Sequence, residues 1–488
     1  MSAYDYDLLI IGSGAAGLTI ASGAAQLGVK VLLIEKNKHM GGDCLHYGCV
    51  PSKTLIKCAK VRHQMSKADA YGLPVPSLDP VDFSKVSAHI QSVIDTIQPH
   101  DSPERFEGLG ATVRFGTAAF VDPHTVALTP SEGGTPENIT AATIVIAAGS
   151  TPSSPPFKGL DQIDYLTNET VFFQQSLPER LTVIGGGPIA VEMAQAMHRL
   201  GSEVTLLQRS AHILSKEDPD MAEVVEESLR SDGVNVVTNT SIEEITQDGG
   251  AITVRYGVKD QPEQTVTSDN LLVALGRAPS VKPLNLEAAG VEYTKKGIPV
   301  DDKMRTNVPH IYAVGDVTGQ YQFTHAAGYE GGIVIANAVF KLPRKANYTW
   351  LPWVTYSDPE LASVGYNEKR AKDAGIAYTV HTEHFGENDR ALAENQPEGK
   401  LKLLLDPKGK VLGVQIVGIH AGELINEWVA VLGGKVKLST LAGAVHPYPT
   451  VGEINKKVAG TILSQKVFSP FTRKILRMLF KYRGKNDD

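Results

Sequence analysis

Apolar runs separated by glycine-rich or polar breaks recur along this chain. Residues 8–11 form a short apolar run, small residues continue through Ala25, and a second apolar run covers residues 31–34. Short apolar runs bounded by glycine are typical of buried parallel strands, and the small-residue stretch between them favours a helix. The same succession returns at Leu181 and ends with the run 204–207. The pattern therefore predicts an α/β fold that contains two similar strand–helix–strand units.

Between the two units the pattern changes. Residues 60–110 follow a helical pattern that a proline-rich stretch interrupts at 73–76, and residues 111–129 alternate apolar and polar side chains like a strand meander. Residues 143–149 form an apolar run that ends in small residues, and residues 150–156 are rich in serine and proline. We expect a buried strand at 143–149, and a linker at a domain boundary at 150–156.

Two more apolar runs extend beyond the second unit. The run 271–275 closes that unit, and residues 306–316 predict a strand whose carboxyl end presents Asp316. Ligands of α/β folds collect at that edge of the sheet. The plainer alternative, and the default from the residues alone, is that Asp316 caps the following helix.

Length and composition narrow the class of protein. A chain of 488 residues suggests roughly three domains, and 42% apolar with 21% charged residues is typical of an ordered globular protein. The net charge of −7 argues against general nucleic-acid binding. Three cysteines favour a reducing compartment. No basic leader precedes the first apolar run and no apolar run reaches membrane-spanning length, so we expect a cytoplasmic protein.

The first strand–helix–strand unit carries a dinucleotide-binding motif. Gly12-Ser13-Gly14-Ala15-Ala16-Gly17 follows the first apolar run, and Glu35 ends the second. In such a motif the first glycine makes a tight turn, the second lets the backbone approach a pyrophosphate, and the third lets the helix pack on the sheet. The acid is placed to hold ribose hydroxyls. The full context favours a nucleotide site over a chance glycine-rich turn.

The second unit carries a variant of this motif. Gly185-Gly186-Gly187-Pro188-Ile189-Ala190 follows its first strand, and Glu192 lies on its helix. Gln208 stands where the acid stands in the first unit, and Arg209 follows it. An acid would repel a 2′-phosphate, whereas arginine can pair with one, so the site favours NADP over NAD. The alternative is a solvent-facing Arg209 with NAD held by Gln208.

A glycine-bracketed stretch that ends at Lys53 holds two of the three cysteines. Cys44 and Cys49 are five positions apart, and five residues of a straight helix rise about 7.5 Å, which is too far for a relaxed disulfide. The chain must therefore bend at its glycines if the two cysteines pair. Pro51 fits the first turn of a helix, so Cys49 is expected at a helix N-terminus, where a thiolate is favoured. A dithiol built this way is a redox device.

Two plainer interpretations of the cysteines remain. They could be buried structural residues, or half of a zinc site. Zinc needs third and fourth ligands at usable spacing, and only Cys58 is left, without a His or Cys pair beside it. The sequence therefore favours the redox pair and predicts no metal site.

Together these motifs resemble the flavoprotein disulfide reductases, the pyridine nucleotide–disulfide oxidoreductase family that includes dihydrolipoamide dehydrogenase, glutathione reductase and mercuric reductase. The resemblance spans residues 6–453. It implies that the first unit and Asp316 bind FAD and that the second unit binds the nicotinamide nucleotide. Cys44 would be the interchange thiol that meets the substrate, and Cys49 the charge-transfer thiol beside the flavin. Lys53 and Glu192 match the family's ion pair near flavin N5, where charge tunes the flavin.

The resemblance also implies a set of cofactor contacts. The expected FAD contacts are Gly12, Ser13, Gly14, Ala16, Gly17, Glu35, Lys36, Gly42, Lys53, Gly116, Ala118, Ala148, Gly149, Asp316, His325 and Ala326. The expected contacts of the nicotinamide nucleotide are Gly185, Gly187, Pro188, Ile189, Glu192, Gln208, Arg209, Gly276 and Arg277.

The implied fold class is α/β, with two Rossmann-like three-layer domains, for FAD and NAD(P), and a C-terminal α+β interface or dimerisation domain. The domains expected are FAD-binding at 1–150 and 281–347, NAD(P)-binding at 151–280, interface at 348–465 and a basic amphipathic tail at 466–488. Family members are usually two-fold dimers in which this interface domain completes the partner's active site, so we expect a homodimer.

The chain departs from the family's thiol-handling members at the C-terminal motif. Those members carry a His followed five residues later by Glu, whereas here Tyr448 stands five residues before Glu453 and His446 lies earlier. A tyrosine, with a pKa of about 10, is a poor general base at neutral pH. Tyrosine at this place resembles the mercuric reductases, where it would serve as a ligand or donor near the metal-bound thiols.

The resemblance to mercuric reductases is also incomplete. No cysteine follows Cys58, so the C-terminal pair that hands Hg(II) to the inner thiols is absent from the sequence. Asp43 replaces the small hydroxyl residue common before the first cysteine, and its charge would raise the pKa of Cys44 and disfavour anionic substrates.

The leading hypothesis is an enzyme that passes hydride from NAD(P)H through FAD to a Cys44–Cys49 disulfide. The electrons would go on to a disulfide, metal-ion or related acceptor, small or protein-bound. Two alternatives are a flavin-only NAD(P)H:quinone reductase or oxidase, and a redox-sensing, membrane-associated binding protein.

The tail beyond the family motif predicts an amphipathic helix. Ile475, Leu476, Leu479 and Phe480 recur at helical spacing, and the opposite positions are basic. Basic amphipathic helices can lie on anionic membrane surfaces, here the inner face of a membrane. We favour the alternative, in which this helix packs on its own subunit or on the dimer partner.

Overall fold

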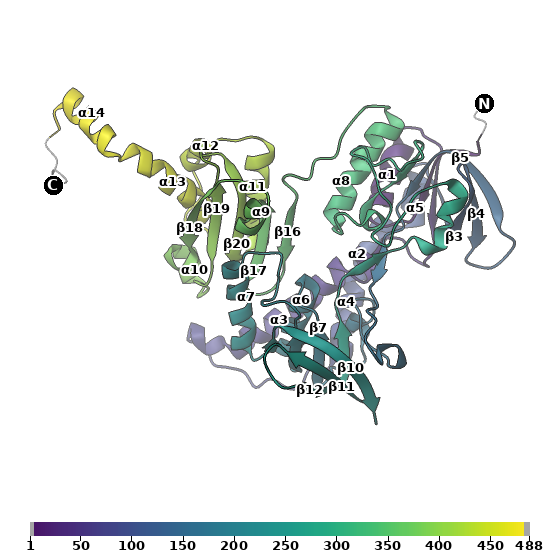
Figure 1. The fold of residues 1–488 in the computed structure, drawn as a ribbon, viewed down its shortest axis with the longest axis horizontal. Coiled ribbons are helices and arrows are strands. Elements are labelled where there is room, and N and C mark those ends of the chain that lie inside the picture. Colours follow the sequence, from purple (N-terminus) through teal and green to yellow (C-terminus); the bar gives the residue numbers. More distant parts are fainter. Residues whose placement is uncertain (1–3, 483–488) are drawn as a thin grey trace. The chain divides into compact units, whose positions relative to one another are not determined.

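The computed structural model describes residues 4–482, and its chain divides into two compact units (Figure 1). The first unit comprises Met1–Met65, Ser77–Arg209 and Asn239–Tyr348, and the second comprises Ser66–Pro76, Ser210–Thr238 and Thr349–Asp488. Among the helices of residues 4–482, none is both long enough and apolar enough to cross a membrane. The mixed α/β class expected from the sequence is confirmed.

A parallel sheet lies at the centre of the part of the first unit that carries the first glycine motif. Its strands follow the order β3 (Thr112–Asp122), β2 (Val31–Glu35), β1 (Tyr6–Ile11), β5 (Glu137–Ile146) and β15 (Ile311–Ala313). β4 (Thr125–Pro130) pairs antiparallel with both β3 and β5, which confirms the meander expected from the alternation.

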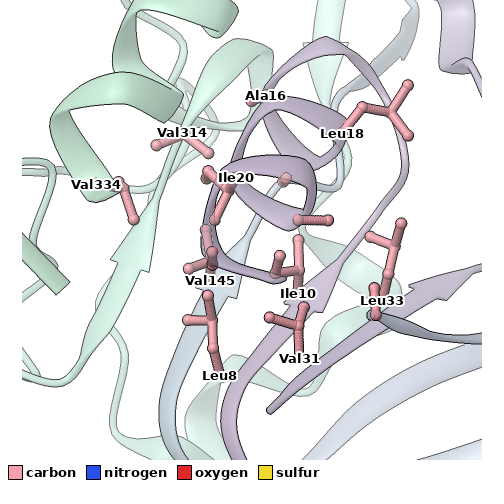
Figure 2. Packing of buried hydrophobic residues seen from close by; sticks show 14 of the residues in the cluster. Leu8, Ile10, Ala16, Leu18, Ile20, Val31, Leu33, Val145, Val314 and Val334 are labelled. Atoms are coloured by element: carbon pink, nitrogen blue, oxygen red, sulfur yellow. The ribbon is translucent and has the colours of Figure 1, made fainter. Parts of the chain in front are cut away.

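Helices α1 (Ala15–Gln26) and α8 (Thr324–Val334) cover one face of this sheet (Figure 2). Leu8 and Ile10 of β1 point toward this helical layer and are fully or almost fully buried. Leu9, between them, is buried in the core on the other face. Because both faces of the sheet are covered, the strand is a continuous apolar run rather than an alternating one.

The second glycine motif lies in a second parallel sheet of the same unit. This sheet contains β13 (Asn270–Val273), β7 (Arg180–Ile184) and β8 (Glu203–Leu207), and α6 (Pro188–Leu200) packs against it. The repeat of strand, helix and strand is therefore confirmed. A separate antiparallel sheet consists of β10 (Thr240–Asp248), β11 (Ala251–Val258) and β12 (Gln264–Ser268).

The segment expected to be a linker begins as a strand. β6 (Ser150–Pro152) pairs antiparallel with β14 (Arg277–Pro279). The chain therefore enters residues 153–276 and leaves them through two adjacent strands. The helical region expected at 60–110 is also broken more than predicted, because residues 72–82 form no helix. The α-helices between β2 and β3 are α2 (Gly42–His46), α3 (Cys49–Ser66), α4 (Phe83–Ile97) and α5 (Pro103–Gly108).

The second unit is built on a five-stranded antiparallel sheet. Its strand order is β16 (Pro352–Thr355), β17 (Glu360–Gly365), β20 (Val411–Gly418), β19 (Lys400–Leu405) and β18 (Thr379–His384). The unit also contains α7 (Pro219–Asp232), β9 (Asn235–Val237), α9 (Glu368–Asp373), α10 (Asp389–Ala393), α11 (Ala421–Gly433), α12 (Leu438–Gly443), α13 (Glu453–Val467) and α14 (Pro470–Phe480). The indole of Trp428 on α11 is fully buried in the core and donates a hydrogen bond to Asn455 of α13 at 2.8 Å.

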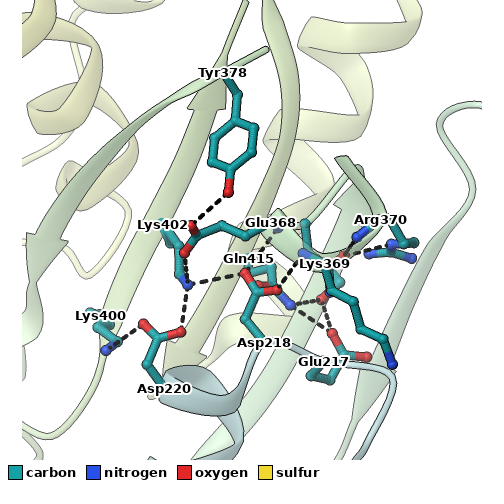
Figure 3. A network of polar contacts seen from close by, with 12 residues as sticks. Glu217, Asp218, Asp220, Glu368, Lys369, Arg370, Tyr378, Lys400, Lys402 and Gln415 are labelled. Atoms are coloured by element: carbon teal, nitrogen blue, oxygen red, sulfur yellow. Dashed lines mark hydrogen bonds and ion pairs between the residues drawn. The ribbon is translucent and has the colours of Figure 1, made fainter. Parts of the chain in front are cut away.

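A buried lysine ties two helices to this sheet (Figure 3). Lys402 of β19 is 2% exposed, and its ammonium group contacts the carboxylates of Asp218, Asp220 and Glu368 at 2.5–3.0 Å. These acids stand at the starts of α7 and α9, where carboxylates also complement the helix dipole. A buried charge needs such pairing, and the three acids satisfy it, so the cluster serves the fold.

Candidate redox site

The two cysteines of the glycine-bracketed stretch lie on two consecutive helices. α2 carries Cys44 and ends at His46, and α3 begins at Cys49, as expected for a thiol at a helix N-terminus. The chain turns into α2 through Gly41, whose φ of +113° is open to glycine and strained for other residues. Gly48 is needed for space, because a Cβ there would lie 2.9 Å from the Asp43 carboxylate. The bend that a disulfide requires is therefore present.

The two thiols perturb each other in opposite directions. Cys44 donates a hydrogen bond to the sulfur of Cys49, which raises the pKa of Cys44 and lowers the pKa of Cys49 to about 6. Thr324, at the start of α8, lies 3.3 Å from the Cys49 sulfur. It and the charge of Lys53 lower the pKa of Cys49 further. The pair therefore combines a protonated thiol with a thiolate at neutral pH.

Lys53 and Glu192 are brought together from the two glycine-motif regions. Lys53 lies one turn after Cys49 on α3, and its ammonium group contacts the Glu192 carboxylate of α6 at 3.0 Å. Glu192 is 5% exposed, whereas Lys53 is 37% exposed. The ion pair thus links the helix of the cysteine pair to the helix of the second glycine motif.

The carboxylate of Asp43, next to Cys44 in the chain, is paired with other side chains. It raises the pKa of Cys44, as expected, but less than the hydrogen bond to Cys49 and burial do. Its carboxylate contacts the Arg277 guanidinium at 3.0 Å and accepts a hydrogen bond from Asn168 at 3.2 Å. The expected penalty for anionic substrates is therefore reduced, because the negative charge is paired.

Arg277 stands at the centre of a network that sequence reasoning missed. Its guanidinium is 10% exposed, donates to the Ser150 hydroxyl at 2.7 Å and lies 3.6 Å from the Asp316 carboxylate. Arg277 was expected among the nucleotide contacts, but these bonds direct it toward Asp43 and Asp316. The available signal in the sequence was Asp43, the unusual acid before Cys44, whose charge needs a basic partner such as Arg277.

Asp316 lies in a short 3₁₀ turn (Gly315–Thr318) just beyond the carboxyl end of β15, close to where the pattern predicted it. Its carboxylate accepts a hydrogen bond from Ser150 at 2.5 Å, and burial raises its pKa. The alternative that it caps the next long helix is wrong, because α8 has Phe323 at its N-cap. Asp316 is therefore available at the sheet edge where ligands bind.

The first glycine motif fits a dinucleotide pyrophosphate. A Cβ at Gly12 would overlap the Ala147 carbonyl, and one at Gly17 would overlap the Gly12 carbonyl, so both must be glycine. Gly14 is the N-cap of α1, and no described residue would lie within 4 Å of a Cβ there. The N-terminus of α1 is therefore open at Gly14, and its free N–H groups can bind an anion such as a pyrophosphate. A Cβ at Gly42 would lie 2.7 Å from the Gly14 Cα, so the cysteine-bearing helix begins directly against this loop.

Glu35 is buried at the end of β2. Its Oε2 accepts hydrogen bonds from the Ser13 amide at 2.9 Å and hydroxyl at 2.6 Å, and Oε1 accepts from the Asn37 amide at 2.8 Å. These bonds fix the carboxylate against the glycine loop. A carboxylate accepts about four hydrogen bonds, so capacity for ribose hydroxyls remains.

The second motif has the same open cap. Gly187 is the N-cap of α6, and a Cβ there would meet no described residue within 4 Å. Gln208 is buried at the end of β8, where its side chain lies against Gly186, and Arg209 is exposed. An exposed arginine beside an open helix N-terminus fits a second nucleotide phosphate.

The other expected contacts lie at the edges of these two sheets. Gly116 and Ala118 are on β3, Lys36 follows β2, and Ala148 and Gly149 follow β5. The first turn of α8 holds His325 and Ala326, Gly276 precedes β14, and Pro188 and Ile189 open α6.

Two family models match almost the whole chain. Residues 6–331 match the family described as pyridine nucleotide-disulphide oxidoreductase, and residues 351–459 match its dimerisation domain. The chain belongs to this family. Members of this class of flavoprotein disulfide reductases are oxidoreductases that use FAD and NAD(P)H.

Proteins similar to this chain carry several different names. A mercuric reductase of Staphylococcus aureus is 34% identical over 459 residues, which cover 94% of this chain and 82% of the relative. A dihydrolipoyl dehydrogenase of Bacillus subtilis (strain 168) is 35% identical over 448 residues, covering 91% of this chain and 96% of the relative. The Cu(II) complex of the HOCl-induced flavoprotein disulfide reductase RclA from Escherichia coli is 27% identical, with a TM-score of 0.82 over 94% of this chain and 99% of that chain.

The C-terminal motif of the chain lies in the second unit. The Tyr448 side chain is 69% exposed, and its hydroxyl donates a hydrogen bond to Asp389 at 2.8 Å, which raises the pKa of Tyr448. His446 lies 2.9 Å from Glu427, and Glu453 begins α13. Asp389 and Glu427 had no signal in the sequence, because both are far from the motif in the chain.

The hydrogen bond between the cysteines makes a testable prediction about pH. In a Cys58→Ala background, Cys44→Ser keeps an O–H donor to Cys49, whereas Cys44→Ala removes it. We expect the rate of Cys49 alkylation by iodoacetamide to rise with pH through a midpoint near 6 in the serine variant. In the alanine variant the midpoint should rise by roughly one unit or more, toward the ordinary thiol value. Equal midpoints in the two variants would show that the hydrogen bond does not set the pKa.

Proposed function

We propose that this protein is an NAD(P)H-dependent FAD oxidoreductase that delivers electrons through Cys44 and Cys49 to a disulfide or thiophilic metal-ion acceptor. The observation that carries the proposal is the placement of Cys44 on α2, which begins against the dinucleotide loop, and of Cys49 at the N-terminus of α3, where the pKa of its thiol is lowered. A structural cysteine pair would need neither the thiolate nor the helix N-terminus.

The residues that would hold the cofactors follow from the open helix caps. The loop at Gly12–Gly17, with Glu35 and Asp316, would hold FAD, and the loop at Gly185–Gly187, with Gln208 and Arg209, would hold the nicotinamide nucleotide. Bound FAD would supply two-electron exchange between the nicotinamide and the cysteine pair. Lys53, fixed by Glu192 at 3.0 Å, would place a positive charge at that exchange.

The cysteine pair can reduce a disulfide without a separate histidine base. The Cys49 thiolate takes the Cys44 proton along the hydrogen bond that joins them, and the Cys44 thiolate attacks one sulfur of the substrate disulfide. A mixed disulfide forms, and the first product thiolate leaves. Cys49 then gives its proton to the first product thiolate and attacks the Cys44 sulfur, which forms the Cys44–Cys49 disulfide and releases the second thiolate. Two electrons and one proton pass from the pair to the substrate, and the second product thiolate takes its proton from water.

Tyr448 would favour an acceptor that is a ligand-seeking cation. Because its O–H is donated to Asp389, the phenol oxygen has lone pairs to offer. The raised pKa makes a general-base role weaker still. Relatives named mercuric reductase, and the Cu(II) complex of RclA, support testing metal ions beside disulfides.

An acceptor panel tests this function. Anaerobic NADPH and NADH oxidation would be followed with lipoamide, glutathione disulfide, Hg(II), Cu(II) and a quinone. We expect turnover with a disulfide or a thiophilic metal ion that is lost in Cys44→Ser. Turnover confined to the quinone, and retained in Cys44→Ser, would contradict the proposal and indicate flavin-only chemistry.

We also propose that Arg209 selects NADPH. Arg209→Gln should lower kcat/KM for NADPH by roughly ten- to hundredfold, the value of a charge-assisted hydrogen bond. The value for NADH, measured on the same variant, should change little because NADH has no 2′-phosphate. A parallel fall with both nucleotides would instead indicate that Arg209 holds a group common to them.

The domain partition and the dimer are proposals of the same kind. The adjacent strands β6 and β14 support an NAD(P)-binding domain at 151–280 inserted into an FAD-binding domain at 1–150 and 281–347. The match of residues 351–459 to the dimerisation domain supports an interface domain at 348–465 and a homodimer. Analytical ultracentrifugation would test the dimer, and a monomer at micromolar concentration would contradict it.

A further inference from the structure

The last described helix exposes a broad apolar face. In α14 and the residue pair that follows, Phe471, Met478, Leu479, Phe480 and Tyr482 are 60–72% exposed. None of the side chains of α14 is buried. Figure 1 shows α14 continuing beyond α13, away from the sheet of its own unit. The part of the expectation in which this helix packs on its own subunit is therefore wrong, whereas packing on the dimer partner stays a prediction.

The apolar side chains fall on one side of the helix. At about 100° per residue, Phe471, Ile475, Met478 and Leu479 share a continuous arc that Leu476 and Phe480 widen. The opposite arc holds the basic residues, which are Arg473, Lys474, Arg477 and Lys481. Residues 470–482 contain no acidic residue, although the chain as a whole has a net charge of −7.

This distribution matches the chemistry of an anionic lipid surface. Apolar and aromatic side chains of an interfacial helix enter the acyl boundary, and long basic side chains at the edges reach the headgroups. Anionic headgroups complement a helix that is basic and has no acid, in a chain that is otherwise acidic. Val467 and Phe468, 55% and 65% exposed, extend the apolar surface back toward α13.

We propose that α14 binds the surface of an anionic membrane and lies in the plane of its interface. This goes beyond the oxidoreductase function and does not depend on it. A homodimer would present two such helices, so that weak single contacts add into stable binding.

Vesicle flotation of the full chain tests the proposal. The probes are vesicles of phosphatidylcholine alone, and vesicles of equal parts phosphatidylcholine and phosphatidylglycerol. The variants are Leu479→Glu on the apolar arc, Lys474→Glu with Lys481→Glu on the basic arc, and Leu73→Glu as a control. Leu73 is 60% exposed and lies outside α14, so the control adds the same charge at an equally exposed apolar residue.

We expect the chain to float with the anionic vesicles and much less with the neutral ones. Both α14 variants should reduce the partition coefficient by about tenfold or more, and Leu73→Glu should leave it unchanged. Circular dichroism and NAD(P)H oxidation would verify that the variants fold. Two results would overturn the proposal: failure of the unmodified chain to bind anionic vesicles, and equal binding by all variants. A change of oligomeric state in Leu479→Glu without a change in vesicle binding would also overturn it, and would assign the face to a subunit contact.

Discussion

The Cys44→Ser variant is expected to lose NAD(P)H-driven reduction of the acceptor by at least about 10³-fold in kcat, as happens when a covalent nucleophile is removed. Serine keeps the hydrogen bond to Cys49, so the thiolate and the surrounding fold persist. Only the sulfur that attacks the substrate is gone. Steady-state assays with the best acceptor of the panel measure the loss, and absorbance of the purified variant measures whether flavin remains bound.

Cys58→Ser is the matched control. Cys58 lies on α3, the helix that begins at Cys49, and burial raises the pKa of its thiol. The same atom is exchanged on the next helix along the chain, away from the thiolate. Activity should therefore be unchanged. An equal loss of activity in both serine variants would indicate that neither α2 nor α3 tolerates such an exchange, and the assignment of Cys44 would fail.

The second large effect is expected for Lys53→Met. Removal of the ammonium breaks the 3.0 Å ion pair between Lys53 and Glu192, whose side chain is 5% exposed. Breaking a buried pair costs up to about 3–5 kcal/mol, and we expect about 2 kcal/mol because Lys53 is partly exposed. The charge that Lys53 would supply is lost at the same time, which should slow flavin reduction by roughly 10²-fold. Thermal unfolding and anaerobic stopped-flow absorbance measure the two effects.

Two further variants separate stability from chemistry. Lys57→Met removes an exposed lysine one turn along α3 and should change neither quantity. The double variant Lys53→Met with Glu192→Gln removes both charges, so it should recover much of the stability but none of the rate. Recovery of both in the double variant would show that the ion pair acts only on folding.

Local sequence patterns were sufficient for the elements that carry the nucleotide loops. Two apolar strands flanking a glycine turn and a helix predicted both β1–α1–β2 and β7–α6–β8, because turn geometry and helix capping depend on residues close in the chain. The start of α3 at Cys49 was predicted for the same reason, since Pro51 is suited only to a first helical turn.

Contacts between distant segments could not be predicted in this way. Arg277 contacts Asp43 and Ser150 because the pairing of β6 with β14 brings residues far apart in the chain close together. The spacing of apolar residues does not indicate which distant segments pair. The bond from Tyr448 to Asp389 joins a loop to α10 and had no spacing signal. The partner of the tail helix could not be predicted, because amphipathicity indicates that an apolar face needs a partner without indicating which.

The most direct test of the account is the state of the cysteines after reduction by nucleotide. The oxidised protein would be treated anaerobically with a stoichiometric amount of NADPH, alkylated with iodoacetamide, digested and mapped by mass spectrometry. We predict that Cys44 and Cys49 are joined by a disulfide before treatment and are both alkylated after it, whereas labelling of Cys58 does not change. Consumption of NADPH while the Cys44–Cys49 disulfide stays intact would contradict the account, because electrons would then bypass the pair.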